Sequence, residues 1–336
     1  MGKNEPVELR RKLVKSAGKG AINDLPKNVR GLEPFLYRDR LWLMDQEMNT
    51  WVREKKGWRH LGPQGKKVWH KTRIPVAEAR GDPLPAGDRL LVVTTAGRIF
   101  ELTGEEWSLL HHPGKEIPIQ AAAMTWDPSK ERIVAWYGGK DGTSSRSRAE
   151  RTTTWVFEKG AWRLVFEEQT RQIASKTQLI FDQGLGHVVR LWAEDVGVMV
   201  DDRWELYHPK DYEPDWQRVY QDPVTGEVLT EHPIQNEMEY ARFDIGRCDA
   251  VAFLGYSPAE GAEAGTAKVV DEADEAGYAE WYDPAVRTAF SEARAFPDVV
   301  MALDLSPAFE AAKKLGPRTK PGRGAKPKPP KGKKDA

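Results

Sequence analysis

The chain has 336 residues and a mass of 38.0 kDa, and its 51 Lys and Arg balance 51 Asp and Glu. Hydrophobic residues make up 40% and charged residues 30%, as in a soluble globular protein, which excludes a fully disordered chain. No run approaches the ~20 apolar residues of a membrane-spanning helix. Cys248 is the single cysteine, which excludes an internal disulfide and a cysteine-rich zinc site. The N-terminus lacks the apolar stretch of a secretory signal, so we expect a cytoplasmic protein.

The neutral total hides segments of opposite charge. Residues 1–30 carry +5 and residues 313–336 carry +9, so the residues between them carry −14. Within that body, residues 259–312 hold twelve acids and three bases. The chain therefore has basic ends around an acidic body. In the basic segment 1–30, residues 7–17 (VELRRKLVKSA) predict one short helix.

A repeated unit begins at residue 31, and its clearest copy is 124–166. The copy opens with an aromatic-Asp pair, Trp126-Asp127, followed by a turn, an apolar strand and the pair Gly138-Gly139. This order is typical of a hairpin with a capped turn. The aromatic-Asp pair and the apolar strand recur at Phe181-Asp182, at Phe243-Asp244 and, more loosely, at Asp82-Pro83, but the glycine pair is single or missing in these copies.

The second half of the unit is a hairpin that carries two aromatic residues. Trp155 and Trp162 lie seven residues apart, on two β-rich runs joined by a turn. Related hairpins contain Trp51 and Trp58, Phe100 and Trp107, and, with a shorter turn, Trp204. We interpret these tryptophans as core residues that pack one sheet against the next.

The spacing of the second-hairpin tryptophans predicts a β-propeller. Trp58, Trp107, Trp162 and Trp204 are separated by 49, 55 and 42 residues. Such intervals are close to the ~40–50 residues of a propeller blade, which contains about four strands. Five units fit between residues 31 and 258, so we predict one all-β propeller of about five blades, with four to six as the range. The incomplete first and fifth units suit a ring closed by strands from both chain ends.

The C-terminal part differs in composition. Residues 259–316 predict an acidic linker and a helical segment, in which Asp283-Pro284 and Ser306-Pro307 are helix starts. Between these helices, residues 299–305 (VVMALDL) predict a strand. The Lys- and Pro-rich residues 317–336 lack the apolar residues needed for a core and predict a disordered tail.

The unit at 124–166 resembles the kelch-type repeat of bacterial β-propellers. The residues MTWDPSKERIVAWYGG and TTTWVFEKGAWRLV carry its aromatic-Asp pair, glycine pair and two-Trp hairpin in order. The resemblance implies a propeller fold and an interaction platform. It transfers no catalytic residue, because a shared fold does not fix function.

The search for chemistry identifies no metal site, no cofactor motif and no nucleophile motif. The repeated carboxylates Asp127, Asp182 and Asp244 are the candidates for a carbohydrate-active enzyme, which needs two carboxyl groups about 5–9 Å apart. The competing interpretation is that they cap turns. We expect the second role, and an enzyme remains the less favoured alternative.

The expected function is a non-catalytic scaffold that binds another protein through its loops. The polar loop 138–153 is interpreted as the longest insertion between strands and as the contact element. Three tryptophans outside the repeat register, Trp69, Trp216 and Trp281, are candidates for an exposed aromatic rim. A nucleic acid or an anionic surface that binds the basic residues 313–336 is the other alternative. The predicted binding residues are Lys140, Asp141, Arg146, Arg148, Arg151, Trp69 and Trp216.

Overall fold

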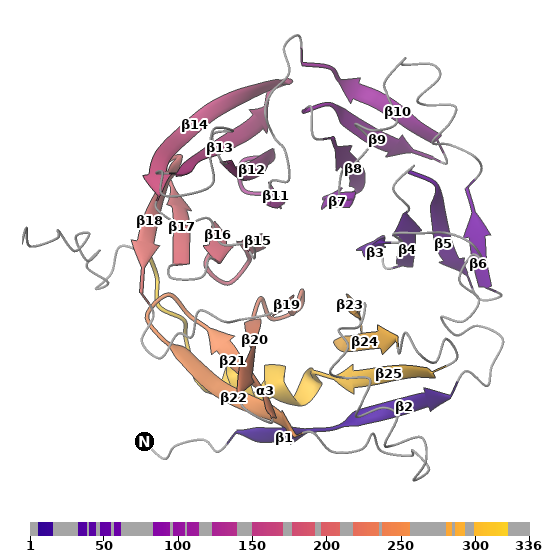
Figure 1. Ribbon diagram of the computed structural model, residues 1–336, viewed down its shortest axis with the longest axis vertical. Helices are drawn as coiled ribbons and strands as arrows, with labels where there is room; N and C mark the ends of the chain where they lie inside the picture. The colour runs from indigo at the N-terminus through magenta and orange to yellow at the C-terminus, as the bar shows by residue number, and fades with distance from the viewer. Residues whose placement is uncertain are drawn as a thin grey trace, which may run out of the picture.

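Alternating apolar and polar residues form short strands, and these strands make a ring of six sheets in the computed structural model (Figure 1). The count is one more than the five repeat units and lies within the predicted four to six. The chain is an all-β single propeller with a short C-terminal helix. The structure describes residues 6–15, 33–38, 40–44, 48–54, 57–61, 83–94, 97–104, 106–113, 123–139, 150–170, 177–191, 196–208, 218–234, 237–255, 280–283, 286–292 and 299–321.

The first four blades each take four consecutive strands in antiparallel order, beginning with the innermost strand. Blades one and two contain β3 (Glu33–Tyr37), β4 (Arg40–Met44), β5 (Thr50–Glu54), β6 (Gly57–His60), β7 (Pro83–Ala86), β8 (Arg89–Val93), β9 (Ile99–Thr103) and β10 (Glu106–His111). Blades three and four contain β11 (Ala123–Asp127), β12 (Arg132–Gly139), β13 (Glu150–Glu158), β14 (Ala161–Thr170), β15 (Gln178–Asp182), β16 (His187–Leu191), β17 (Val196–Val200) and β18 (Arg203–Tyr207). The predicted Trp-bearing hairpins are thus confirmed as outer strand pairs.

The last two blades combine C-terminal strands with strands from the N-terminus. Blade five contains β19 (Arg218–Gln221), β20 (Val228–Ile234), β21 (Glu237–Phe243) and β22 (Cys248–Gly255), with β1 (Val7–Leu9) added in parallel to β22. Blade six contains β23 (Glu280–Asp283), β24 (Thr288–Glu292) and β25 (Val299–Asp304), with β2 (Arg11–Lys15) antiparallel to β25. Strands from both chain ends close the ring, as the sequence indicates.

Two predicted helices are wrong, and both segments are strands instead. Residues 7–17 contain β1 and β2, because pairing with β22 and β25 satisfies their backbone groups along the outer edges of two blades. The segment after Asp283 contains β24, which pairs with β23 and β25. The ring therefore extends beyond the predicted limits 31–258 on both sides.

The other two C-terminal predictions are confirmed. The residues expected to form a strand are β25, and the second helix is α3 (Ser306–Lys314), with Pro307 in its first turn. Lys313 and Lys314 lie in its last turn, where positive side chains interact favourably with the helix dipole and stabilise the helix. The described residues include no helix long and apolar enough to cross a membrane.

Tryptophan side chains join neighbouring blades by a repeated hydrogen bond. Trp107 on β10 of blade two donates its indole N–H to Thr50 Oγ1 on β5 of blade one, at 2.9 Å. Trp204 on β18 of blade four makes the same contact with Thr154 Oγ1 on β13 of blade three, at 2.7 Å. Both indoles are buried, so these tryptophans are core residues that also fix the position of one blade against the next.

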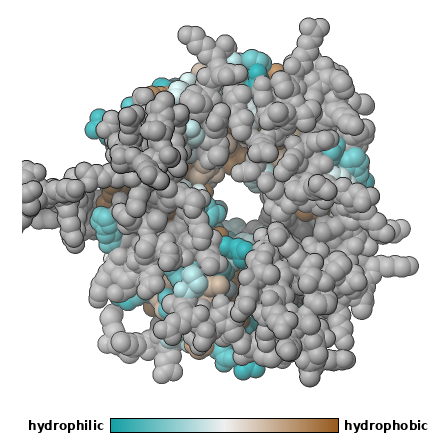
Figure 2. Space-filling model, viewed as in Figure 1, coloured by the Kyte–Doolittle hydropathy of each residue, from teal (hydrophilic) through white to brown (hydrophobic). Residues whose placement is uncertain are grey.

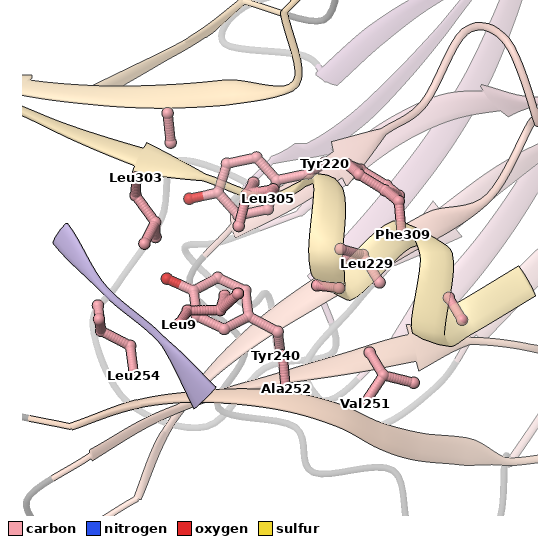
Figure 3. Close-up of a cluster of buried hydrophobic side chains, with 13 residues drawn as sticks. Leu9, Tyr220, Leu229, Tyr240, Val251, Ala252, Leu254, Leu303, Leu305 and Phe309 are labelled. Atoms are coloured by element: carbon pink, nitrogen blue, oxygen red, sulfur yellow. The ribbon is translucent and has the colours of Figure 1, made fainter. Parts of the chain in front are cut away.

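An apolar cluster fills the space between blades five and six and extends under α3 (Figure 3). It contains a buried polar group, because Tyr220 and Tyr240 both hydrogen-bond to Glu231. Burial and the Glu231 charge together raise the pKa of both tyrosines well above the ordinary value, so both stay neutral at physiological pH. Leu9 of β1 and Phe309 of α3 are in the same cluster, which therefore unites the two chain ends.

Candidate functional site

Of the seven predicted binding residues, one lies in the part of the chain that the structure describes, and only its backbone is described. Arg151 lies in β13, where it pairs with Gly139 on β12 and Gln169 on β14. The remaining six, Lys140, Asp141, Arg146, Arg148, Trp69 and Trp216, lie outside the described residues. Their role stays a prediction.

The connection 140–149 starts at the end of an extended hairpin in blade three. Strands β12 and β13 stay paired over seven positions, from Ile133–Phe157 to Gly139–Arg151. The equivalent strands of blade four, β16 and β17, pair over three positions. The connection is the longest within a blade, but the prediction that it is the longest insertion between any two strands is wrong. The connections 16–32, 61–82, 112–122 and 256–279, each between two blades, contain more residues. The connection 140–149 is therefore joined to a longer paired hairpin than the corresponding connection of blade four.

The opposite end of the blades carries a set of turns that we call the turn face. Consecutive strands of a blade run in opposite directions, so the first-to-second and third-to-fourth turns lie at the same end. The turns after Asp127, Asp182 and Asp222 define this face. The connection 140–149 leaves from the other end. Figure 2 shows that the ring is open along its axis, with hydrophilic residues beside part of the opening.

The candidate catalytic carboxylates are held in turns. Asp127 accepts hydrogen bonds from the Ser129 backbone N–H and the Arg132 guanidinium, and the other two bind turn N–H groups in a similar way. Side-chain oxygens that accept backbone N–H groups two or three residues ahead are typical turn caps. The turn-capping interpretation is therefore supported. Each carboxylate is engaged within its own turn and does not form part of a pair of catalytic carboxyl groups. The described residues contain no cluster of three or more groups suited to hold a metal ion.

The repeat alignment placed two carboxylates incorrectly and missed another. Pro83 begins β7, so the Asp82-Pro83 pair is not in the turn between the first and second strands of blade two. Asp244 lies between the third and fourth strands of blade five, whereas Asp127 and Asp182 lie between first and second strands. The true equivalent in blade five is Asp222, which accepts hydrogen bonds from the Val224 and Thr225 backbone N–H groups at 3.2 Å each. The sequence signal is an Asp-Pro pair directly after the first strand, as at 127–128 and 222–223; the pair alone is not sufficient, because Asp82-Pro83 stands at the start of a first strand.

Arginines connect these turns across blade boundaries. Arg132 of blade three reaches Asp202 of blade four at 2.5 Å, and Arg287 of blade six reaches Asp222 of blade five at 2.9 Å. Burial acts to raise the pKa of Asp222, but hydrogen bonds from Thr225 and Val224 and the Arg287 charge outweigh it, so this pKa lies below its ordinary value. The turn face is thus fixed by buried or partly buried ion pairs.

Residues 315–321, which we call the C-terminal strap, run from α3 onto the turn face. The Arg318 guanidinium binds both carboxylate oxygens of Asp182, at 2.6 and 2.5 Å, and the Gly226 carbonyl at 3.3 Å. Its carbon lies 5.6 Å from the centre of the Phe243 ring, in cation–π range. The predicted disordered tail is therefore wrong at its start, because 317–321 are held in place, while 322–336 lie outside the described residues.

The neighbours of Arg318 fix the course of the strap. Arg242 donates to the Gly316 carbonyl at 2.7 Å, and the Thr319 backbone N–H donates to the Asp244 carboxylate at 2.9 Å. Gly316 has φ of 85°, the left-handed conformation that turns a chain away from a helix end. Asp244 thus serves both its own turn, through the Gly246 N–H, and the strap.

Comparisons with known proteins assign no family to the chain. No family model and no curated protein match it. A Pyrococcus horikoshii acylaminoacyl peptidase has 10% identity and a TM-score of 0.41, over 65% of this chain and 38% of that one. A structure of YCF48 bound to D1 peptide has 13% identity and a TM-score of 0.39, over 79% and 75%. YCF48 from Cyanidioschyzon merolae has 12% identity and a TM-score of 0.38, over 88% and 85%. The kelch-type resemblance stays a prediction, and we draw no function from these likenesses.

Proposed function

We propose that the propeller is a non-catalytic scaffold that binds another protein, and that the connection 140–149 is its main contact element. The extended β12–β13 hairpin carries this proposal, because it presents one connection on longer paired strands than blade four does. Loops held by a rigid frame bind with a smaller loss of conformational entropy than free loops.

The ion pairs of the turn face support the role of the ring as a frame. The carboxylates that the repeat makes available, Asp127, Asp182 and Asp222, are engaged by turn N–H groups and arginines. Groups held in this way stabilise the fold and are not presented to a reacting substrate. A binding role therefore fits the described residues better than the carbohydrate-active alternative.

The chemistry of the connection indicates the kind of partner. Residues 140–149 contain Lys140, Arg146 and Arg148 against the single acid Asp141. Arginine is enriched at protein interfaces, where its planar group binds carboxylates with two hydrogen bonds. We therefore propose a partner protein with an acidic patch, with Trp69 and Trp216 as further contact residues.

A charge-reversal pull-down tests this proposal. The full-length wild-type protein and the Arg146→Glu/Arg148→Glu variant are used to capture proteins from the native host, and the captured proteins are identified by mass spectrometry. We expect one acidic protein that the wild type captures and the variant loses by at least tenfold, on the order of 1.4 kcal/mol in binding free energy. Binding of the purified partner is then measured by titration calorimetry.

The matched control is Lys130→Glu/Lys159→Glu, which reverses two exposed charges in the turns of blade three at the opposite end of the ring. This control is expected to capture the partner as well as the wild type does. Equal capture by the connection variant and the wild type would remove the proposed contact element. Loss of capture after nuclease treatment would assign the binding to a nucleic acid and contradict a protein partner.

A further inference from the structure

The Arg318 side chain occupies a pocket that blades four and five form on the turn face. The Arg318 side chain is 6% exposed, and the side chain of its partner, Asp182, is fully buried. The pair joins residues 136 positions apart in the chain, so it is a tertiary contact and not a local turn. The pocket has three features that suit a guanidinium: two carboxylate oxygens, a backbone carbonyl at Gly226 and the aromatic ring of Phe243.

The walls of this pocket are held by contacts that do not involve the strap. Asp182 accepts the Leu185 backbone N–H at 3.1 Å, which orients its carboxylate within its own turn. Phe243 is fully buried in the core of blades four and five, and Gly226 donates its N–H to the Asp222 carbonyl at 2.8 Å. The groups that recognise the guanidinium are therefore positioned by the two blades themselves.

Two glycines leave the space that the strap fills. A Cβ atom at Gly184 would lie 2.9 Å from Arg318 Nη1, and a Cβ atom at Gly246 would lie 2.7 Å from Thr319 Oγ1. Neither glycine has the positive φ that would by itself require glycine. The missing side chains therefore make room for an arginine and for the residue that follows it.

We propose that this pocket is a recognition site for an arginine side chain in an extended peptide, and that Arg318 is its resident, exchangeable ligand. Bidentate contact with a carboxylate and stacking on a ring select a planar guanidinium over an ammonium group. The Thr319 N–H bound to Asp244 adds a backbone contact that any peptide with a residue after the arginine can reproduce. The ligand class is thus an arginine-containing peptide. This site is separate from the connection 140–149, which leaves from the opposite end of the ring.

Chemical rescue in the full-length protein tests the proposal. The Arg318→Ala variant removes the side chain that fills the pocket. The probes are N-acetyl-arginine methylamide and a heptapeptide with the sequence of residues 315–321, each titrated by calorimetry and by thermal unfolding. We expect the variant to unfold at a lower temperature than the wild type, and both probes to bind it saturably and raise that temperature.

Three controls make the outcome specific. N-acetyl-lysine methylamide is expected to bind on the order of tenfold more weakly than the arginine probe, because it lacks the planar fork. Adding Asp182→Asn to the variant is expected to abolish binding of the arginine probe. The wild type, whose pocket is filled by Arg318, is expected to bind the probes at least tenfold more weakly than the variant.

If Arg318→Ala does not fold, Arg318→Lys replaces it, because it keeps the positive charge and loses the bidentate contact. A folded variant that binds neither probe overturns the proposal, and so does a variant that binds the lysine and arginine probes equally. Binding that survives Asp182→Asn also overturns it, because the ligand would then lie elsewhere. None of these outcomes bears on the binding of a partner by the connection 140–149.

Discussion

Arg287 and Asp222 form a bidentate ion pair between the sixth and fifth blades. The Arg287 Nε and Nη2 atoms lie 3.1 and 2.9 Å from the two oxygens of Asp222. The Asp222 side chain is fully buried and that of Arg287 is 20% exposed. Blade six has strands from both ends of the chain, so this pair fastens the blade in which the ring closes to its neighbour.

Replacing Arg287 with alanine is expected to lower the free energy of unfolding by about 3 kcal/mol. The substitution leaves the Asp222 carboxylate buried without its arginine, which costs more than the loss of an exposed pair. Urea denaturation followed by tryptophan fluorescence measures the change.

The matched control is Arg163→Ala. Arg163 also pairs with two carboxylates, Glu158 and Asp202, but its side chain is 50% exposed. Solvent screening limits the expected loss to about 0–1 kcal/mol. Equal losses for the two variants would show that the pair in the closing blade is worth no more than a surface contact.

The ion pair between Arg287 and Asp222 is also expected to make the free energy of unfolding depend on pH. The pKa of Asp222 is lowered in the folded protein, so its stabilising effect is complete above the unfolded value of about 3.9 and is lost as the pH falls through the folded value. The difference in unfolding free energy between the wild type and Asp222→Asn should therefore be constant from pH 7 to pH 5 and shrink below about pH 4. A difference that stays unchanged down to pH 3 would contradict the lowered pKa.

The blades that the sequence predicts are those in which the same residue types recur at the same places in the strands and turns. Trp107 and Trp204 mark outer hairpins because blades two and four each pack a large side chain at the same place against the preceding blade. The turn carboxylates are predicted for the same reason, although Phe243-Asp244 imitates the pattern at a different turn. Asp222 follows Gln221 instead of an aromatic residue, so the repeat pattern misses it.

The strands that close the ring are not predicted from their own residues. In β2, the basic and apolar residues of Arg11–Lys15 suit a short helix as well as a strand. Pairing with β25, almost 290 residues later, decides between the two structures. The contact of Arg318 with Asp182 also joins distant parts of the sequence, 136 positions apart, so composition alone indicates only a basic tail. These features depend on tertiary pairing, which overrides local propensity.

The repeated Trp–Thr hydrogen bond is expected to couple neighbouring blades. In a double-mutant cycle with Trp204→Phe and Thr154→Val, the interaction free energy should be about 1 kcal/mol, as for a buried hydrogen bond. The cycle for Trp107 and Thr50 should give a similar value, because the contact has the same geometry in blades one and two. The mixed cycle of Trp204 and Thr50, which do not touch, should give about zero. A coupling in the mixed cycle as large as in the matched ones would mean that the effect is not carried by the contact.

Closure of the ring by β1 is expected to depend on Leu9. This side chain is 3% exposed and packs in the cluster that also contains Phe309 of α3. Leu9→Ala would leave a cavity between β1 and the helix and should lower the free energy of unfolding by about 3 kcal/mol. Glu8→Ala, on the same strand but exposed, should change it by less than about 0.5 kcal/mol. Urea denaturation gives both values, and limited proteolysis should release the N-terminal residues earlier in Leu9→Ala alone. If Leu9→Ala unfolds and is cleaved like Glu8→Ala, then β1 does not hold the ring closed, and the other strand from the N-terminus, β2, must do so through β25.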